Sequence, residues 1–201
     1  MHAAWYGADD ELAVDDWSLA PRPTTADVEA DEPLWSGYVD NARRRFPTIV
    51  TDDVWRARHE LIDAIPDWHP VRDSLRQTLV HNDFNPRNVC FRSDGRPLIY
   101  DWELAMADVP HRDLAEMLTF SLTPNVDRAA VEAHVDTHRR ALEHALDAPI
   151  DADQWVEGFR CMVRYEAISR VGMQLLFATQ LHLPYVPRVS ATVDHLVQLY
   201  A

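Results

Sequence analysis

The chain contains no lysine: all 19 of its basic residues are arginine, against 33 acidic residues, and the formal net charge is -14. Such a charge repels phosphodiester backbones and anionic lipid surfaces, so neither nucleic acid nor a membrane is expected as a partner. The two cysteines, Cys90 and Cys161, are too few for a disulfide framework in 201 residues. A reducing, cytoplasmic location is therefore expected.

The sequence also has no hydrophobic run of targeting length. Residues 1–7 show no basic region followed by an apolar run, so a secretory signal is not expected. The longest uncharged stretch, residues 171–187, is too short for a transmembrane helix and contains two prolines. Hydrophobic residues at 47% and charged residues at 26% are typical of a globular chain, and the length favours one compact domain.

Charge is unevenly distributed along the chain. Residues 1–32 carry nine acidic side chains against Arg22 alone, which predicts an irregular, solvated lead-in segment. Helix signals follow at residues 33–46, and Thr51 is placed to cap a second helix whose apolar residues keep helical spacing. Beyond Asp108, the pattern again predicts helices, over residues 111–122, 126–146, 152–182 and 189–200.

Between these helical regions lie three short extended runs, at residues 77–81, 88–92 and 97–101. The last two are separated by Asp94-Gly95, which is a strong hairpin signal. The expected fold class is therefore α+β and predominantly helical, with one small β insert near the middle of the chain.

The predicted hairpin brings together two potential metal ligands. If Asp94-Gly95 is a two-residue loop, Asn88 faces Asp101, and directly opposite residues have Cβ atoms about 4.5–5.5 Å apart. An amide oxygen and a carboxylate at that distance suit Mg²⁺, which takes one or two protein ligands together with water and substrate phosphate. The same register pairs the apolar residues on the other face, where they are expected to pack against helices: Val89 with Tyr100 and Phe91 with Leu98.

Another carboxylate precedes the hairpin. Asp83 lies five residues before Asn88, on a loop stiffened by Pro86, from which it can reach a substrate hydroxyl beside the metal. Cys90 would share the strand face of Asn88, where a buried thiol is expected.

The segment His81-Asn82-Asp83-Phe84-Asn85-Pro86-Arg87-Asn88, followed by Ile99-Tyr100-Asp101-Trp102-Glu103, resembles the catalytic and metal-binding segments of the aminoglycoside phosphotransferase and choline kinase-like family. Members of this family have a protein-kinase-like fold. The resemblance implies that Asp83 is the base or hydroxyl-orienting group, that Asn88 and Asp101 bind Mg²⁺, and that His81 braces the loop.

The resemblance also implies ATP as the phosphoryl donor and a small-molecule hydroxyl as the acceptor. Two further residues are candidates for the nucleotide site. Arg87 either contacts a phosphate or is a solvated loop arginine. Glu103 either accepts hydrogen bonds behind the metal ligands or is the first-turn acid of a helix.

The likeness extends beyond these motifs, to Asp113-Leu114-Ala115 and to the opening residues 2–7, which resemble the helix end that begins the family's C-terminal lobe. The chain as a whole, residues 1–201, is therefore interpreted as one such lobe. Its three parts are the acidic lead-in at 1–32, the catalytic loop and metal-binding hairpin at 77–103, and a helical subdomain at 108–201.

The family's N-terminal nucleotide lobe has no counterpart in the sequence. There is no glycine-rich phosphate loop among the five glycines, and no lysine to neutralise the phosphates of ATP. A smaller departure is Asn82, where the family commonly has glycine. Two functions remain open: a catalytic kinase lobe that needs a partner or fused N-terminal lobe, or a non-catalytic binding module derived from such a kinase.

A zinc site is a weaker possibility on the sequence. His134 and His138 stand four residues apart, a spacing that can bind zinc when a third ligand converges. No third ligand is evident, so both histidines are expected on a solvated helix face.

Overall fold

The computed structural model describes residues 1–8 and 22–200, which divide into two compact units. The first unit takes in Met1–Arg22, Ser74–Ser121 and Asp127–Phe159. The second takes in Pro23–Asp73, Leu122–Val126 and Arg160–Ala201. Helix α10 (Ala152–Ile168) contributes residues to both units.

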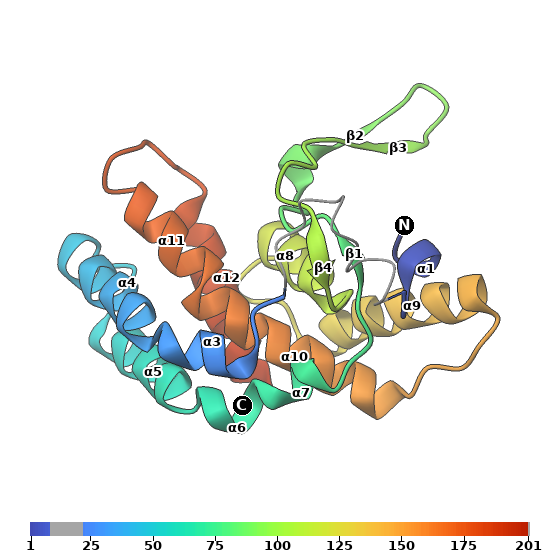
Figure 1. Ribbon diagram of the computed structural model, residues 1–201. Helices are drawn as coiled ribbons and strands as arrows, with labels where there is room; N and C mark the ends of the chain where they lie inside the picture. The colour runs from blue at the N-terminus through green and yellow to red at the C-terminus, as the bar shows by residue number, and fades with distance from the viewer. Residues whose placement is uncertain (9–21, 201) are drawn as a thin grey trace. The chain divides into compact units, whose positions relative to one another are not determined.

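The first unit contains two antiparallel strand pairs (Figure 1). Strand β1 (Thr78–Val80) pairs with β4 (Met106–Asp108), and β2 (Val89–Phe91) pairs with β3 (Pro97–Ile99). Figure 1 shows the β2–β3 hairpin extending well beyond β1 and β4. The helices of this unit are α1 (His2–Trp5), the 3-10 helix η1 (Pro86–Asn88), α8 (His111–Ser121), α9 (Arg128–Leu146) and the first half of α10.

Two hydrogen bonds tie the N-terminal segment of the first unit to strand β1 and the residue before it. The Thr78 hydroxyl donates to the His2 carbonyl at 2.8 Å, and the Gly7 amide donates to the Gln77 carbonyl at 2.8 Å. Gly7 has a φ of 77°, a conformation that glycine adopts without steric cost. The chain therefore turns at Gly7 with α1 held against β1.

The second unit consists of helices and their connections, with no strand among its described residues. It contains α3 (Thr25–Ala30), α4 (Glu32–Arg45), α5 (Asp52–Asp63), α6 (Ile65–Trp68), α7 (Pro70–Asp73), α11 (Arg170–Phe177), α12 (Val186–Leu199) and the second half of α10. Helix α4 packs against α5 and α11. The core of this unit is apolar and includes Val28, Trp35, Val39, Ile62, Leu175 and Val193.

Local caps explain why several of these helices begin where the sequence predicts. The Thr51 hydroxyl accepts a hydrogen bond from the Val54 amide at the start of α5, and the Asp127 carboxylate accepts one from the Ala130 amide at the start of α9. The predicted helices at 33–46, 111–122 and 126–146 are confirmed as α4, α8 and α9. The helix-rich α+β class is likewise confirmed.

Three local predictions are wrong. The helix expected over 152–182 is interrupted at Ser169, whose hydroxyl donates to the Tyr165 carbonyl four residues earlier, a contact that bends helices. The final helix begins at Val186 rather than 189. The acidic lead-in is not irregular throughout, because α3 forms within it with Val28 buried; its acids at positions 9–16 lie outside the described residues.

Strand β4 was not predicted from the sequence.

None of the helices formed by residues 1–8 and 22–200 combines the length and the apolar character needed to cross a membrane.

Candidate active site

The loop at residues 81–88, which carries the predicted base, is anchored by a buried carboxylate of helix α8. Asp113 accepts hydrogen bonds from the His81 amide at 2.8 Å and the Asn82 amide at 2.9 Å, and its side chain is 1% exposed. Hydrogen bonds between backbone N–H groups and a carboxylate are charge-assisted and short. Asp113 therefore fixes the start of the loop that carries Asp83.

The side chain of Asp83 is held by two asparagines. Asn88 donates its Nδ2 to Asp83 Oδ2 at 2.7 Å, and Asn85 donates its Nδ2 to Asp83 Oδ1 at 3.1 Å. Asn88 also donates to the Asp83 backbone carbonyl at 2.9 Å. Each carboxylate oxygen is thus oriented by an amide donor, an arrangement suited to a side chain that must accept a hydrogen bond in one direction.

Asn85 was not identified as a site residue from the sequence. It is fully buried, its Nδ2 also reaches Glu116 Oε1 at 3.3 Å, and its Oδ1 accepts from the Arg87 amide at 3.1 Å. Asp113 was noticed only as part of a family-like segment. Its role as the anchor of the loop was missed because its partners lie 31 and 32 residues away in the sequence.

The predicted register of the hairpin is wrong by one residue. Val89 pairs with Ile99, and the Tyr100 amide donates to the Asn88 carbonyl at 3.1 Å, so Tyr100 and not Asp101 lies opposite Asn88. The reason is the loop: the Gly95 amide bonds the Arg92 carbonyl at 2.9 Å with Gly95 at φ 80°, which gives a three-residue connection instead of the assumed two-residue one.

Both faces of the hairpin are also more exposed than predicted. Phe91, expected to pack against helices, is 73% exposed, and Leu98 and Tyr100 are also exposed. Cys90, expected to be a buried thiol, is exposed as well. The hairpin thus presents apolar side chains to solvent.

Asp101 follows the hairpin in a left-handed backbone conformation, with φ 67°. A non-glycine residue in this region is uncommon and persists where surrounding contacts hold it, often at functional sites. One such contact is made by His81, whose Nε2 donates to the Tyr100 carbonyl at 2.8 Å. The Asp101 carboxylate is exposed and faces no backbone donor among the described hydrogen bonds.

His81 is fully buried at the centre of this region. Its ring lies 4.6 Å from the Trp102 ring and 6.0 Å from the Phe84 ring, measured between centroids. The His81 amide donates to Asp113, and its ring donates to the Tyr100 carbonyl. His81 therefore connects the 81–88 loop to the end of the hairpin.

Arg87 and Glu103, the two residues predicted for the nucleotide site, lie in different surroundings from each other. The Arg87 side chain is not merely solvated, because its Nε donates to Asn85 Oδ1 at 3.1 Å and its guanidinium lies 5.3 Å from the centre of the Phe120 ring. Glu103 is exposed in the turn before β4 and does not begin a helix. Contact of either residue with a cofactor stays a prediction.

The donor atoms available here fit a magnesium ion. Because the Asn88 amide nitrogen points at Asp83, its carboxamide oxygen is the atom that can act as a ligand, and Asp101 offers an exposed carboxylate. Mg²⁺ prefers such oxygen ligands and needs few of them from the protein. Within the described part of the chain, no three His, Cys, Asp or Glu side chains gather as a metal site, which leaves the zinc interpretation of His134 and His138 without support.

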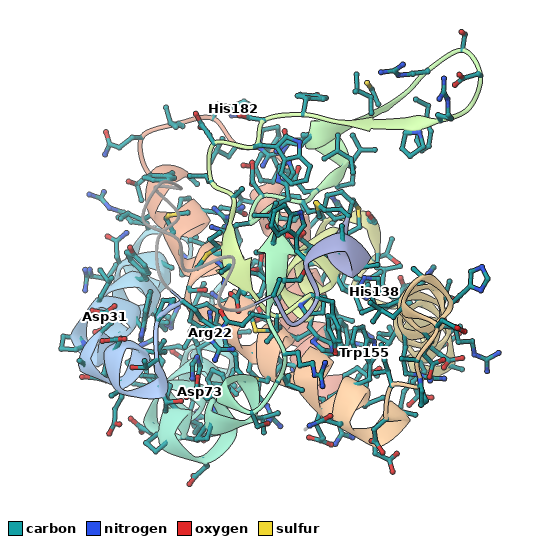
Figure 2. All side chains as sticks on the ribbon, turned by 45° about the vertical axis from the view of Figure 1, so that its right-hand side comes forward. Arg22, Asp31, Asp73, His138, Trp155 and His182 are labelled. Carbon is teal, nitrogen blue, oxygen red and sulfur yellow. The ribbon has the colours of Figure 1, made fainter. Side chains whose placement is uncertain are left out.

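His138 is not on a solvated face as expected. Figure 2 shows it near Trp155, and their ring centroids are 5.4 Å apart. Its Nε2 faces the Nδ1 of His2 at 3.2 Å, and His2 Nε2 lies 3.1 Å from Asp113 Oδ2. Burial, reinforced by the charge of His2, lowers the pKa of His138 to about 4.

The comparisons with known proteins agree with the predicted family. The sequence matches the model of the phosphotransferase enzyme family over residues 9–148, which is most of the chain. The chain therefore belongs to this family of phosphotransferases, and the resemblance inferred from the motifs is confirmed. No curated protein sequence matches the chain significantly.

Among solved structures, choline kinase LicA from Streptococcus pneumoniae is similar to this chain, with a TM-score of 0.46 at 11% sequence identity. The likeness covers 88% of this chain and 64% of that enzyme. The chain thus spans slightly less than two thirds of the length of the choline kinase.

Proposed function

We propose that this chain is the catalytic lobe of a kinase that transfers the γ-phosphoryl group of ATP to a hydroxyl of a small molecule. The observation that carries the proposal is the pair of hydrogen bonds that Asn85 and Asn88 donate to the Asp83 carboxylate. These residues lie inside the segment that matches the phosphotransferase family. Catalysis of phosphoryl transfer is mainly positioning and charge stabilisation, and a fixed carboxylate supplies the first of these.

In this proposal Asp83 accepts a hydrogen bond from the acceptor hydroxyl and orients its oxygen toward the phosphorus. As the new P–O bond forms, the bond between the γ-phosphorus and the bridging oxygen of ATP breaks, ADP leaves, and the hydroxyl proton passes to the Asp83 carboxylate. Asn88, through Oδ1, and Asp101, through its carboxylate, are the residues that would hold Mg²⁺. When bound, the ion would neutralise charge on the phosphates of ATP.

The proposal includes a nucleotide lobe contributed by a partner or a fused domain, with this chain as a single C-terminal lobe. Two observations support it. The 201 residues contain no lysine that could pair with the phosphates. The hairpin beside the site also exposes apolar side chains that a second lobe would cover: Phe91, Leu98, Tyr100, Trp102 and Leu104.

The test is a calorimetric titration of MgATP into the purified chain, followed by an assay of ADP formation with amino sugars and amino alcohols as acceptors. Cationic acceptors are chosen because the chain carries a net charge of -14. The chain alone is expected to bind MgATP weakly and to show little transfer. Both are expected to rise when a lysine-containing lobe, encoded beside this chain or in a longer form of it, is added.

Tight binding of MgATP by the chain alone would contradict the need for a second lobe. No gain in binding or turnover with any such lobe would instead favour a non-catalytic module that kept the substrate site.

A further inference from the structure

Asn82, next to the proposed base, has a backbone conformation that favours glycine. Its φ is 59°, and the other non-glycine residues with positive φ in residues 1–8 and 22–200 are Asp101 and Asp147. Glycine reaches this region without a steric penalty, whereas asparagine tolerates it through local hydrogen bonds. The side chain of Asn82 therefore needs an explanation beyond the shape of the loop.

That side chain joins two segments of the first unit. Its Nδ2 donates to the Leu104 carbonyl at 2.9 Å, and its Oδ1 accepts a hydrogen bond from Arg112 Nε. Arg112 in turn lies 3.7 Å from the buried carboxylate of Asp108. A carbonyl can only accept and a guanidinium can only donate, so these partners fix which end of the amide faces which.

Leu104 belongs to the turn that follows Asp101 and is closed by the bond from the Ala105 amide to the Trp102 carbonyl at 3.0 Å. His81 holds the carbonyl on the other side of Asp101, that of Tyr100. Two consecutive residues of the catalytic loop thus donate to the backbone just before and just after Asp101.

We propose that Asn82 is a positioning residue, whose side chain clamps the turn after Asp101 to the catalytic loop and so keeps Asp101 in register with Asn88 and Asp83. The role as stated rests on the proposed function, because the distance it maintains is the spacing of the magnesium ligands. A glycine at this position would keep the backbone shape of the loop and release the turn.

The experiment compares Asn82→Gly with Asp147→Gly in the full chain. Both replace a residue at positive φ by glycine, and Asp147 is an exposed residue at the end of α9. Relief of the positive φ favours both variants, and in Asn82→Gly it offsets the lost side-chain hydrogen bonds, so both are expected to melt near the temperature of the parent chain. Two readouts separate them: the affinity for Mn²⁺, measured by electron paramagnetic resonance, and the hydrogen exchange of amides 101–105.

Asn82→Gly is expected to weaken Mn²⁺ binding at least about tenfold and to speed exchange across the turn, because one of two clamps on Asp101 is lost. Asp147→Gly is expected to change neither. Parent-like Mn²⁺ affinity and exchange in Asn82→Gly would overturn the proposal, as would a melting temperature well below that of Asp147→Gly, which indicates a purely structural role.

Asn82→Asp separates the two contacts of the clamp. An aspartate keeps an acceptor for Arg112 but loses the donor to Leu104. Amides 101–105 of this variant are therefore expected to exchange as fast as those of Asn82→Gly. Parent-like exchange in Asn82→Asp would overturn the assignment to the Leu104 bond. If the parent chain itself binds no Mn²⁺, the proposed metal site fails, while the exchange data still decide whether Asn82 clamps the turn.

Discussion

Each unit has an aspartate that accepts hydrogen bonds from groups distant in the sequence, and the two aspartates serve different ends. Asp113 is fully buried, and the side chain of Asp194 is 15% exposed. In the first unit, Asp113 accepts backbone N–H groups of His81 and Asn82. In the second unit, Asp194 accepts the Nε and Nη2 of the buried Arg58, at 3.0 and 3.1 Å, and Ser190 accepts from the same Nη2 at 2.7 Å. The first carboxylate shapes a loop, and the second joins helices α5 and α12.

This difference shows where a substitution should be felt. Burial raises the pKa of Asp194, and the charge of Arg58 opposes that shift. The ionised carboxylate is therefore stabilised by its contact with Arg58 and little by water. The loop anchored by Asp113 carries the proposed base and contains Asn82 at positive φ, a conformation that surrounding contacts hold. Changes near Asp83 should therefore affect turnover, and changes near Asp194 should affect folding.

The largest expected effect is that of Asp83→Asn on phosphoryl transfer in the two-lobe assembly proposed above. Turnover should fall by about 10²- to 10⁴-fold, because an amide cannot accept the hydroxyl proton. The free energy of unfolding should change by less than about 1 kcal/mol, since the site is only half-buried. Steady-state ADP formation and urea unfolding measure the two quantities.

The matched control is Asp53→Asn, at an exposed residue of α5 in the other unit. It should leave turnover unchanged and alter the free energy of unfolding by less than about 1 kcal/mol. A variant at Asp83 that keeps its turnover but unfolds much more easily would place Asp83 among the structural carboxylates and break the comparison.

The second expected effect is on folding of the second unit. Arg58→Met should lower the free energy of unfolding by about 3–5 kcal/mol, because it leaves the Asp194 carboxylate buried without its cation. Arg56→Met, in the same helix, should cost less than about 1 kcal/mol, since its pair with Asp53 is exposed. Urea unfolding of both variants gives the difference.

A double variant tests the cause of this loss. Arg58→Met with Asp194→Leu removes both charges and should recover much of the stability, as replacing a buried ion pair by apolar groups often does. A double variant as unstable as Arg58→Met alone would show that packing, not the unpaired carboxylate, is responsible.

The third expected effect is a loss of stability in acid that originates in the first unit. His111 is fully buried with its ring centroid 4.0 Å from that of Trp155, and burial, together with His138 and His2, holds its pKa well below the usual value. The pKa of His138 is lowered to about 4, with Asp113 opposing the shift. The unfolded chain therefore binds more protons than the folded chain below about pH 6.5.

Stability should be complete above about pH 6.5 and fall toward pH 4, by up to about 1.4 kcal/mol per pH unit for each of these histidines. Urea unfolding between about pH 7 and pH 5 measures the slope. His138→Gln should flatten it, whereas His144→Gln, at an exposed position of α9, should not. Equal slopes in His138→Gln and the parent chain would contradict the assignment.

The smallest expected effect distinguishes two helical glycines, one in each unit. A Cβ on Gly158 would lie 2.7 Å from both His111 Cε1 and Leu75 Cδ1, so Gly158→Ala should destabilise the chain by about 1–3 kcal/mol. A Cβ on Gly37 would meet nothing within 4 Å, so Gly37→Ala should stabilise it by about 0.5–1 kcal/mol. Thermal unfolding measures both, and effects of the same sign would refute the packing argument.

Much of the helical framework was predictable because its signals are local. The hydroxyl of Thr51 reaches an amide three residues ahead, and Asp127 does the same at the start of α9. The same holds for Asp83 and Asn88, which contact each other within a single loop. Both partners of such contacts lie within a few residues of each other, so a short stretch of sequence is enough to predict them.

The register of the hairpin could not be predicted from local sequence. Asp94-Gly95 is compatible with a two-residue or a three-residue loop, because glycine at positive φ suits both, and the pairing of whole strands decides between them. That single residue of register determined that Tyr100, and not Asp101, faces Asn88. Phe91 and Cys90 are neighbours on opposite faces of β2 and both are exposed, which the register does not explain.

The sequence by itself determined the family, the helix-rich class and the loop that holds Asp83. Only the tertiary structure decided which side chains support that loop: Asp113, some 30 residues further along, and Asn82, whose amide bridges to Leu104 and Arg112. The physical reason is that hydrogen bonds depend on position in space, and distant segments of the chain acquire their relative positions only when the core of the unit packs.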